Sequence, residues 1–318
     1  MPEKPYISVV IPVYNEEENL PELLARLKTS LQAIGQPFEV ILVNDGSRDR
    51  SLEILREAAD QDPHLVVVDF NRNYGQHAAV FAGFEASRGE IIVTLDADLQ
   101  NPPEEIAKLV AKMEEGYDVV GSVRVQRQDS LFRRMASRLI NRVTSMATGV
   151  QLHDYGCMLR AYRRGVVKTL CASKEISTFI PVLADIFAGR VTEIPVAHAE
   201  RLRGESKYSF FKLIRLQFDL MTSFSLLPLR ATMTVGVFTA ILSMAVAVVL
   251  IAGRLVMGRD WAVSGVFTLF AALFFFMGVL LFGIGLLGEY VGRIYMEVRR
   301  RPRYVVRQVI GREPEAKP

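Results

Sequence analysis

The sequence contains little cysteine, the residue that forms disulfides and binds structural zinc in small domains. Its 318 residues include only two cysteines, Cys157 and Cys171, with no C-x-x-C spacing and no histidine cluster beside them. The two cysteines therefore argue against a disulfide scaffold and against a structural zinc site, and a reducing compartment is expected. There is also little excess of charge, because 38 Lys and Arg nearly balance 35 Asp and Glu. This balance argues against nucleic acid as a partner.

Targeting and phosphate-loop signals are missing as well. Residues 1–5 carry no basic region, and the short apolar run that follows contains Pro12. This pattern is not that of a signal peptide. No glycine-rich turn of the dinucleotide-binding or P-loop type follows any of the strands predicted below, so neither a dinucleotide nor ATP on a phosphate loop is the expected ligand.

Hydrophobicity, in contrast, is abundant. Half of the residues are hydrophobic, and the mean hydropathy is +0.20. Ala231–Gly253 and Trp261–Gly288 are uncharged runs of 23 and 28 residues, each longer than the roughly 20 residues that span a bilayer core. Neither run has a polar face, as a packed helix of a soluble protein would. We therefore expect two transmembrane helices within 231–288, joined by a short connection at 254–260.

The charges around these runs predict their orientation. Basic residues precede the pair, and 289–318 reads as a basic tail, with eight basic and three acidic side chains in 293–318. The positive-inside rule then places the preceding domain and the C-terminus in the cytoplasm. Arg254 and Arg259 in the connection oppose this orientation but are outnumbered. Residues 208–230 mix aromatic, aliphatic and basic side chains, which favours interfacial amphipathic helices over a packed amphipathic helix.

The first 207 residues alternate short apolar runs with longer amphipathic ones, which predicts the α/β class. The expected strands are Ile7–Val13, Phe38–Val43, Leu65–Phe70, Ile91–Leu95 and Tyr117–Val123. Apolar runs of this kind are typical of a parallel sheet covered by helices on both faces. Helices are expected over Glu16–Ile34, with Asn15 as N-cap and Gly35 as the stop, and over Pro102–Glu115. Ligands of such folds bind at the carboxyl ends of the strands.

The most informative short motif is Asp96-Ala97-Asp98, directly after a predicted strand. Two carboxylates one residue apart can converge on Mg²⁺ or Mn²⁺, and the cation can bridge a diphosphate. Gln100 can offer another oxygen. The alternative, an aspartate acting as a helix N-cap, explains one of the carboxylates but not both.

Polar clusters follow two other predicted strands. The first is 12–16, Pro-Val-Tyr-Asn-Glu, and the second is 44–47, Asn-Asp-Gly-Ser. An aromatic ring and an aspartate at strand ends can stack a base and hydrogen-bond its edge. A simple turn is the alternative for 44–47. Three acidic strand ends along one edge of a sheet make the stronger case for a nucleotide site.

These motifs resemble those of a known family. The strings at 10–16, 43–47 and 95–103 (Leu-Asp-Ala-Asp-Leu-Gln-Asn-Pro-Pro) are similar to glycosyltransferase family 2, which has the GT-A, Rossmann-like nucleotide-sugar fold. With two C-terminal spans, the similarity narrows to polyprenyl-phosphate glycosyltransferases. The strings at 71–77, 154–162 and 204–210 resemble the bacterial members that transfer 4-deoxy-4-formamido-L-arabinose from its UDP donor to undecaprenyl phosphate. Those members act at the inner membrane in lipid A modification and polymyxin resistance.

The resemblance also implies roles for individual residues. The expected uridine contacts are Pro12, Tyr14, Glu16 and Asp45, with Asp45 at the uracil edge. Asp96 is expected near the ribose and the metal, and Asp98 and Gln100 as ligands of Mg²⁺ or Mn²⁺. Gly75 and Gln76 are expected in a loop that closes over the nucleotide. Arg201, Ser206 and Lys207 match a mobile phosphate-binding loop. A homo-tetramer in contact with membrane lipids is implied for the assembly.

The basic stretch from Arg124 to Arg142 has two interpretations. One is a solvated helix face, the usual fate of a charge run. The other is a receiver of the lipid phosphate, because guanidinium groups bind phosphate bidentately and stay charged. We take Arg124 and Arg133 as the contacts to the acceptor phosphate. Asp154 either orients the acceptor or sugar, as a catalytic residue, or belongs to a structural turn.

The expected reaction follows from its nucleophile. A phosphate monoester is already ionised at pH 7, so no general base is required, and the family implies a single inverting displacement. A processive polysaccharide synthase is excluded, because the only tryptophan, Trp261, does not lie in a Gln-x-x-Arg-Trp motif. Two alternatives stay open: the same transfer with glucose, mannose or N-acetylhexosamine, and a non-catalytic nucleotide-sugar-binding subunit.

Overall fold

The structure is a computed structural model that describes residues 4–124, 157–173, 179–197, 222, 226–257, 266–299 and 301–311. The chain divides into two compact units. The first consists of Met1–Ser145, Gly149–Tyr208 and Arg300–Pro318, and the second of Met146–Thr148 and Ser209–Arg299. Each unit is described separately below.

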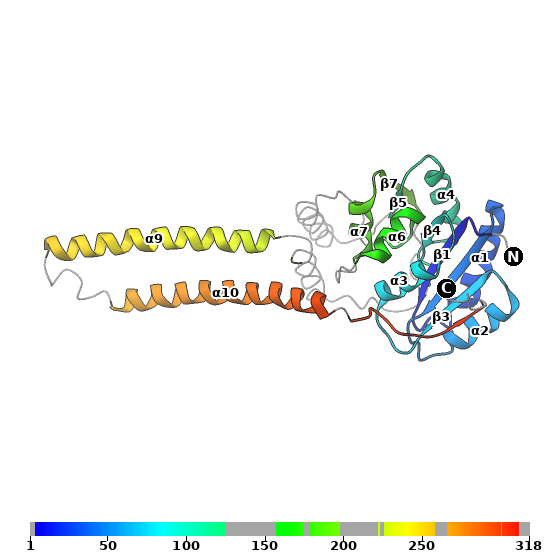
Figure 1. Cartoon of the computed structure of the whole chain (residues 1–318), viewed down its shortest axis with the longest axis horizontal. Coiled ribbons are helices and arrows are strands. Elements are labelled where there is room, and N and C mark those ends of the chain that lie inside the picture. The colour runs from blue at the N-terminus through cyan, green and yellow to red at the C-terminus, as the bar shows by residue number, and fades with distance from the viewer. Residues whose placement is uncertain are drawn as a thin grey trace. The chain divides into compact units, whose positions relative to one another are not determined.

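The described strands of the first unit form one sheet in the order β7-β5-β6-β4-β1-β2-β3-β8. The strands are β1 (Ile7–Val13), β2 (Phe38–Asn44), β3 (Leu65–Phe70), β4 (Ile91–Thr94), β5 (Val119–Arg124), β6 (Arg160–Arg163), β7 (Val191–Val196) and β8 (Val306–Ile310). All five strands expected from the sequence are present within two residues of their predicted bounds. Figure 1 shows the sheet with its helices around it.

The sheet is mixed, whereas the sequence predicted a parallel one. The four strands β4, β1, β2 and β3 are parallel and adjacent. Outside them, β6 runs antiparallel to both β4 and β5, and β8 runs antiparallel to β3. The expectation fails because buried strands are apolar in either direction, so composition does not report strand polarity. The carboxyl ends of the four parallel strands nevertheless meet at one edge, as predicted.

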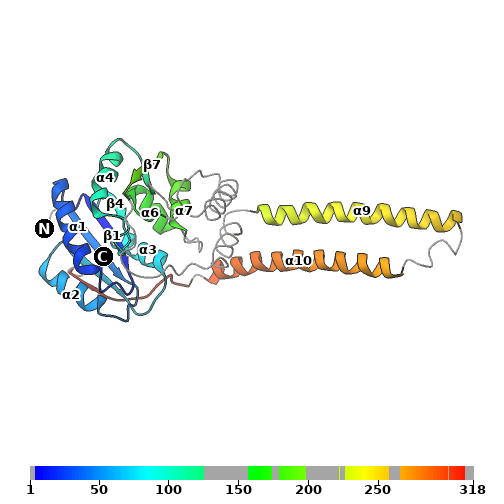
Figure 2. The same ribbon diagram turned by 180° about the vertical axis from the view of Figure 1, so that it is seen from behind.

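Helices cover both faces of the sheet. They are α1 (Leu20–Ile34), α2 (Ser51–Gln61), α3 (Gln76–Ala86), the 3₁₀ turn η1 (Pro103–Glu105), α4 (Ile106–Glu114), α6 (Arg164–Ala172) and α7 (Ile180–Phe187). Helices α1, α2 and α4 pack on one face, and α3, α6 and α7 on the other. Figure 2 shows the same arrangement from behind.

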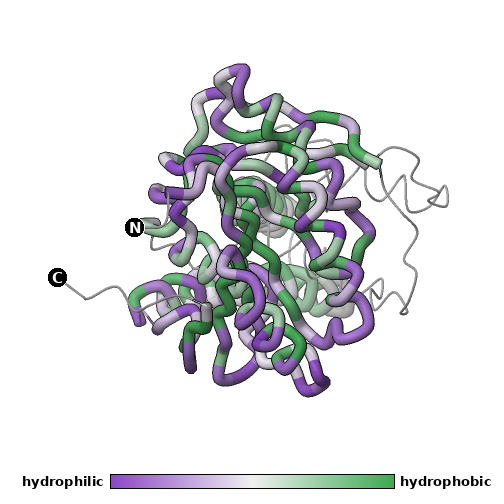
Figure 3. Tube along the Cα trace, turned by 90° about the vertical axis from the view of Figure 1, so that its right-hand side faces the viewer, coloured by the Kyte–Doolittle hydropathy of each residue, from purple (hydrophilic) through white to green (hydrophobic). Residues whose placement is uncertain are grey.

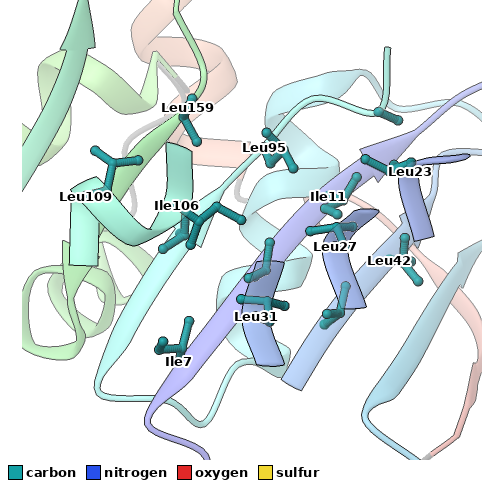
Figure 4. Close-up of a cluster of buried hydrophobic side chains, with 14 of the residues drawn as sticks. Ile7, Ile11, Leu23, Leu27, Leu31, Leu42, Leu95, Ile106, Leu109 and Leu159 are labelled. Carbon is teal, nitrogen blue, oxygen red and sulfur yellow. The ribbon is translucent and has the colours of Figure 1, made fainter. Parts of the chain in front are cut away.

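The main core lies between the sheet and helices α1 and α4. Leu23, Leu27 and Leu31 of α1 are at most 2% exposed and point towards the strands. Figure 4 shows them beside Ile7, Ile11, Leu42, Leu95, Ile106, Leu109 and Leu159. In Figure 3 the hydrophobic segments of this unit gather in its interior and the hydrophilic ones at its periphery. Burial of this apolar surface is the main favourable term in folding.

Two predicted helix starts differ from the structure. Helix α1 begins at Leu20 with Asn19 as N-cap, not at Glu16 with Asn15 as N-cap, and it ends at the left-handed Gly35 as expected. The helix predicted over 102–115 begins as a 3₁₀ turn and is α-helical only from Ile106. Before α1, residues 15–17 instead form a loop at the end of β1, where their backbone amides donate to side chains of the segment after β2.

The second unit contains two long helices, α9 (Leu227–Met257) and α10 (Val266–Arg299), which lie side by side. Stretches of both, Pro228–Val246 and Ala272–Arg299, are long and apolar enough to cross a membrane. Large apolar side chains along both helices are exposed, among them Phe238, Phe274 and Phe282 at 65–68%. This confirms the two expected apolar helices. Most of the interfacial segment expected at 208–230 lies outside the described residues.

The segment expected as a basic tail at 289–318 contains regular structure. Helix α10 continues to Arg299, and β8 then adds to the edge of the sheet beside β3. A strand of five residues with several charges nearby gives little signal in a sequence, because its pairing with β3 is a contact between distant residues. Strand β8 was therefore not predicted from the sequence.

Candidate active site

The described members of the predicted site follow the parallel strands at their carboxyl ends. Pro12 is near the end of β1 and Tyr14 follows it, with a ring 42% exposed. Asp45 follows β2, Gly75 and Gln76 lie between β3 and α3, and Asp96 and Asp98 follow β4 with Gln100. Since β4, β1, β2 and β3 are neighbours in this order, these residues share one edge of the sheet. That edge is the usual ligand site of an α/β fold.

Reciprocal hydrogen bonds lock the loops after β1 and β2 together. The Asn15 amide donates to Ser47 Oγ (3.1 Å), and the Arg48 amide donates to Asn15 Oδ1 (2.8 Å). The Glu16 amide donates to Ser51 Oγ at 2.9 Å. Asn15 has φ 55°, a left-handed conformation that asparagine tolerates better than most residues. Asn15 therefore shapes the loop that presents Tyr14, a role that a helix-cap reading of the motif misses.

Asp45 is the anchor of the next loop. Its side chain is 2% exposed, and its carboxylate accepts hydrogen bonds from the backbone amides of Tyr74 (2.6 Å) and Gly75 (2.9 Å). Burial raises the pKa of Asp45, and the two amides oppose that shift. Each carboxylate oxygen has a second acceptor site, so the group can still receive a donor from a ligand. Asp45 thus holds the Tyr74–Gln76 loop at the strand ends.

Gly46 allows the loop after β2 to lie close to the loop after β3. Its φ is 66°, and a Cβ at this position would lie 2.5 Å from the carbonyl carbon of Arg72 and 2.6 Å from the amide nitrogen of Asn73. Both atoms belong to backbone and cannot swing aside. The Asn73 side-chain amide also donates to the Asp45 carbonyl at 3.2 Å. The loops after β2 and β3 therefore pack backbone against backbone, which is a position for glycine.

The loop also reaches the acidic motif. Gln76 donates its side-chain amide to Asp96 Oδ1 at 2.6 Å. The structure thereby brings together four of the predicted residues, Asp45, Gly75, Gln76 and Asp96, through hydrogen bonds along one edge. Next in the chain, burial lowers the pKa of His77 to about 4, so its imidazole is neutral at pH 7. No catalytic role was predicted for His77.

The Asp98–Gln100 turn is held in an uncommon conformation. Leu99 has φ 60° although it is bulky and only 3% exposed, and such outliers concentrate at functional sites. The Gln100 amide donates to Asp98 Oδ1 at 3.2 Å. Beneath the turn, Asn101 contacts the Cys157 thiol at 3.6 Å, and that thiol lies 2.8 Å from Ser122 Oγ. No role for Cys157 was predicted from the sequence. In the structure it packs beneath the Asp98–Gln100 turn.

The residues present fit a divalent cation held partly by substrate. Within the described ranges, no group of three or more His, Cys, Asp or Glu side chains could hold a metal alone. Two carboxylates and an amide oxygen with substrate phosphates are, however, a common arrangement for Mg²⁺. Asp96 and Asp98 are half-buried at a strand end, which leaves them accessible to a diphosphate. The donor set therefore suits a cation that arrives with its nucleotide.

Six predicted site residues lie wholly or partly outside the described residues. Arg124 is the last residue of β5, and only its backbone is described. Arg133, Asp154, Arg201, Ser206 and Lys207 lie outside the described residues. Their roles stay predictions.

A buried polar group lies in α7, on the face of the sheet opposite α1. Neither carboxylate oxygen of Asp185 has a hydrogen-bond partner among the described residues. Burial raises its pKa to about 6, with Arg160 opposing the shift and Glu193 adding to it. Arg160 is completely buried, and its backbone pairs with Thr94 at the end of β4. The ionised form of Asp185 is therefore a cost to the folded state at neutral pH.

We predict that Asp185→Asn stabilises the protein at pH 7.5 but not near pH 4. The folded pKa lies above the ordinary value of 3.8, so the folded protein binds a proton more tightly than the unfolded chain does. The contribution of Asp185 to wild-type stability then falls as pH rises from about 4 to about 6, by about 1–2 kcal/mol after allowance for partial exposure. Thermal melts at both pH values measure the difference. An equal effect of the substitution at both values would contradict the assignment.

Comparisons with known proteins agree with this architecture. A solved structure of glucosyl-3-phosphoglycerate synthase from Mycobacterium tuberculosis, in complex with Mn²⁺, uridine-diphosphate-glucose and phosphoglyceric acid, superposes with a TM-score of 0.50. The match covers 69% of this chain and 78% of that one at 18% sequence identity. It shows a shared fold.

Much closer relatives exist in sequence. An undecaprenyl-phosphate 4-deoxy-4-formamido-L-arabinose transferase of Pseudomonas aeruginosa (strain LESB58) is 56% identical, over 99% of this chain and 94% of the relative. The protein of the same name from Yersinia enterocolitica is 56% identical over 96% of this chain and 94% of the relative. The model of the family "Glycosyl transferase family 2" matches residues 8–171, which include all the described strand-end residues above. The chain therefore belongs to glycosyl transferase family 2.

Proposed function

We propose that this glycosyltransferase moves 4-deoxy-4-formamido-L-arabinose from its UDP donor to undecaprenyl phosphate at the bacterial inner membrane. The observation that carries the proposal is the 56% identity to relatives of that name over nearly the whole chain. The strand-end site of Tyr14, Asp45, Asp96 and Asp98 supports it. So do the two helices long and apolar enough to cross a membrane. The proposed role is lipid A modification and the polymyxin resistance that follows from it.

The donor would bind along the edge formed by β4, β1 and β2. The Tyr14 ring, 42% exposed, would stack on the uracil, and Asp45 would accept from its edge. Pro12 and Glu16 would line the uridine site, and Gly75 and Gln76 would cover it. Stacking on an aromatic ring contributes about 1–3 kcal/mol per base. The diphosphate would then reach the acidic residues after β4.

Asp98 and Gln100 would hold Mg²⁺ or Mn²⁺, with Asp96 beside the ribose. When bound, the cation would offset the negative charge that develops on the departing UDP. The chain's own contribution is placement, because the left-handed Leu99 and the contact of Asn101 with Cys157 determine where the Asp98 carboxylate lies. Placement of this kind is a large part of catalysis when the reactants need no activation.

The acceptor phosphate is ionised at pH 7 and can attack the anomeric carbon directly. One of its oxygens forms the new bond to that carbon while the bond to the UDP oxygen breaks, and UDP leaves with the electron pair. A single displacement inverts the anomeric configuration. We propose that Arg124 and Arg133 bind the acceptor phosphate and that Arg201, Ser206 and Lys207 close over the phosphates. Asp154 would orient the acceptor or the sugar.

We propose that α9 and α10 form a hairpin with both outer ends in the cytoplasm. Strand β8 follows α10 and pairs with β3, so the chain before α9 and after α10 contributes to the same sheet. A sheet lies on one side of a membrane, and the chain between its strands must therefore cross an even number of times. The excess of Lys and Arg at both flanks favours the cytoplasmic side. From the family resemblance we further propose a homo-tetramer surrounded by membrane lipids.

The proposal predicts donor selectivity in isolated membranes. Membranes that contain the protein, supplied with undecaprenyl phosphate, are expected to use the UDP-linked formamido-arabinose about a hundredfold or more faster than UDP-glucose. Chromatography of the lipid product measures transfer, and membranes without the protein are the control. Transfer of glucose with none of the formamido sugar would contradict the proposed donor. Donor binding without turnover would instead favour a non-catalytic subunit.

A further inference from the structure

The C-terminal segment after α10 returns to the first unit beside the proposed donor site. Strand β8 pairs antiparallel with β3, with Val68 opposite Val309 and Asp69 opposite Gln308. The register shifts between Asp69 and Phe70, where β3 gives way to the loop that leads to Gln76. Strand β8 therefore lies next to a loop more than 230 residues away in sequence.

The first link runs through the buried carboxylate of Asp69. This residue is 0% exposed, and its Oδ1 accepts from the Asn44 side-chain amide at 2.8 Å. Its Oδ2 accepts from Gln308 at 3.1 Å and lies 3.8 Å from Nη1 of Arg307. Asn44 is the residue directly before Asp45. Removing the partners of a buried carboxylate is costly, so β8 stabilises the group that positions Asn44 and its neighbour.

The second link runs through Asn71. Nη2 of Arg307 donates to the Asn71 carbonyl at 3.2 Å, and the Asn71 amide donates to the Val305 carbonyl at 3.3 Å. The Asn71 side-chain oxygen in turn accepts from the Tyr74 hydroxyl at 2.9 Å. Tyr74 is the residue whose amide bonds to Asp45. The guanidinium of Arg307 therefore joins both sides of the bend, Asp69 before it and Asn71 after it.

Aromatic packing adds a third link. The Tyr304 ring stacks on Phe70, with centroids 4.9 Å apart and an interplanar angle of 15°. Tyr74 meets the same Phe70 ring edge-on at 5.7 Å. Phe70 is 1% exposed, and its buried ring lies in contact with both Tyr304 and Tyr74. Pairs of this kind contribute about 0.5–1.5 kcal/mol beyond their buried area.

We propose that β8, through Arg307, is a positioning element for the donor-site loop at Asn71–Gln76. The inference rests on the proposed function, because the loop carries the residues assigned to the nucleotide. Arg307 touches neither Asp96 nor Asp98 among the contacts described and acts through Asp69 and Asn71. Its loss leaves the chemistry of transfer intact but lets the loop sample positions in which the nucleotide binds less well. Loss of Arg307 is therefore expected to weaken binding of the UDP-sugar donor.

The test is steady-state kinetics of Arg307→Met with full-length protein in detergent. The KM for the UDP-sugar is expected to rise about threefold to tenfold, as for the loss of one or two partly exposed charged hydrogen bonds. The kcat and the KM for undecaprenyl phosphate stay within twofold of wild type. Arg307→Lys keeps the charge but lacks the guanidinium fork whose two terminal nitrogens face Asn71 and Asp69. Its donor KM is expected to lie between those of wild type and Arg307→Met. Arg56→Met, which removes an exposed arginine from α2, is the matched control.

Hydrogen exchange gives a readout that needs no substrate. The amides of Tyr74 and Gly75 are expected to exchange faster in Arg307→Met than in wild type or Arg56→Met. Gln308→Leu, which removes only the bond to Asp69, is the second variant if the first does not fold. Unchanged exchange and an unchanged donor KM would overturn the inference while leaving the proposed function in place. If the wild-type protein were inactive with every UDP-sugar but exchange were still faster in the variant, only the proposed function would be overturned.

Discussion

Replacing Asp98 with alanine is expected to reduce sugar transfer about a thousandfold or more, equivalent to about 4 kcal/mol of lost transition-state stabilisation. Asp98 follows β4 at the edge where Asp45, Gln76 and Asp96 come together. On the proposed assignment, Asp98 would hold the cation that offsets the charge of the departing diphosphate, and the alanine variant would lose that ligand. The rate of UDP release with saturating donor and undecaprenyl phosphate measures the loss.

Asp98→Asn separates the charge from the shape of the turn. An asparagine keeps an oxygen at the position that accepts from the Gln100 amide, a bond 3.2 Å long in the structure. If the negative charge is what matters, this variant is nearly as inactive as the alanine variant. Asp60→Ala removes an exposed carboxylate from α2 and is expected to leave transfer unchanged. A wild-type rate for Asp98→Ala would refute the assignment of this residue to the cation.

The same experiment tests the dependence on a divalent ion. Wild-type protein treated with a chelator is expected to lose transfer and to regain it with Mg²⁺ or Mn²⁺. Asp98→Ala is expected to require a much higher ion concentration, or not to recover. Full activity of the chelated wild type would exclude the cation from the mechanism.

Replacing Gly46 with alanine is expected to lower the free energy of unfolding by about 3 kcal/mol and to weaken donor binding. The left-handed φ of 66° costs about 1–2 kcal/mol for an L-residue. The added methyl group would lie 2.5 Å from the Arg72 carbonyl carbon, so the backbone of the Arg72–Gly75 loop must shift. That shift moves the amides that bond to Asp45.

Gly35→Ala is the matched control for this prediction. Gly35 also has a left-handed conformation, with φ 72°, but a Cβ there meets nothing within 4 Å. Its replacement is therefore expected to cost only the conformational part, about 1 kcal/mol, with no effect on donor binding. Chemical or thermal unfolding and calorimetry with UDP measure the two effects. Equal losses for both variants would mean that the close approach to Arg72 contributes nothing.

Much of the first unit could be predicted from the sequence because its signals are local. Five strands and helices α1 and α4 follow from runs of apolar residues and their spacing, and the left-handed stop at Gly35 follows from glycine alone. The strand-end motifs at 12–16, 44–47 and 96–100 were identified by their position after those runs. Parallel strands then bring their ends to one edge, which is a consequence of topology rather than of any particular contact.

Two of the features that were not predicted depend on how distant strands pair. The mixed polarity of the sheet and strand β8 depend on which distant segments meet, and neither apolar content nor period reports that. Asn15 was predicted as a helix N-cap, but it forms a left-handed bend. Asparagine is favoured in both positions, so the residue type does not distinguish them. Cys157 was assigned no role because only its distance to Asn101 reveals one.

The α/β class, the two apolar helices, the strand-end residues and, through resemblance to relatives, the family could therefore be predicted from the amino-acid sequence. These are properties of local pattern and of motifs. Three contacts became visible only in the folded chain: Asp45 bonds to the Tyr74–Gln76 loop, Gly46 packs against the Arg72 backbone, and Arg307 joins Asp69 to Asn71. Each contact joins atoms that are far apart in the chain. The packing of the sheet and its helices sets the distance between them.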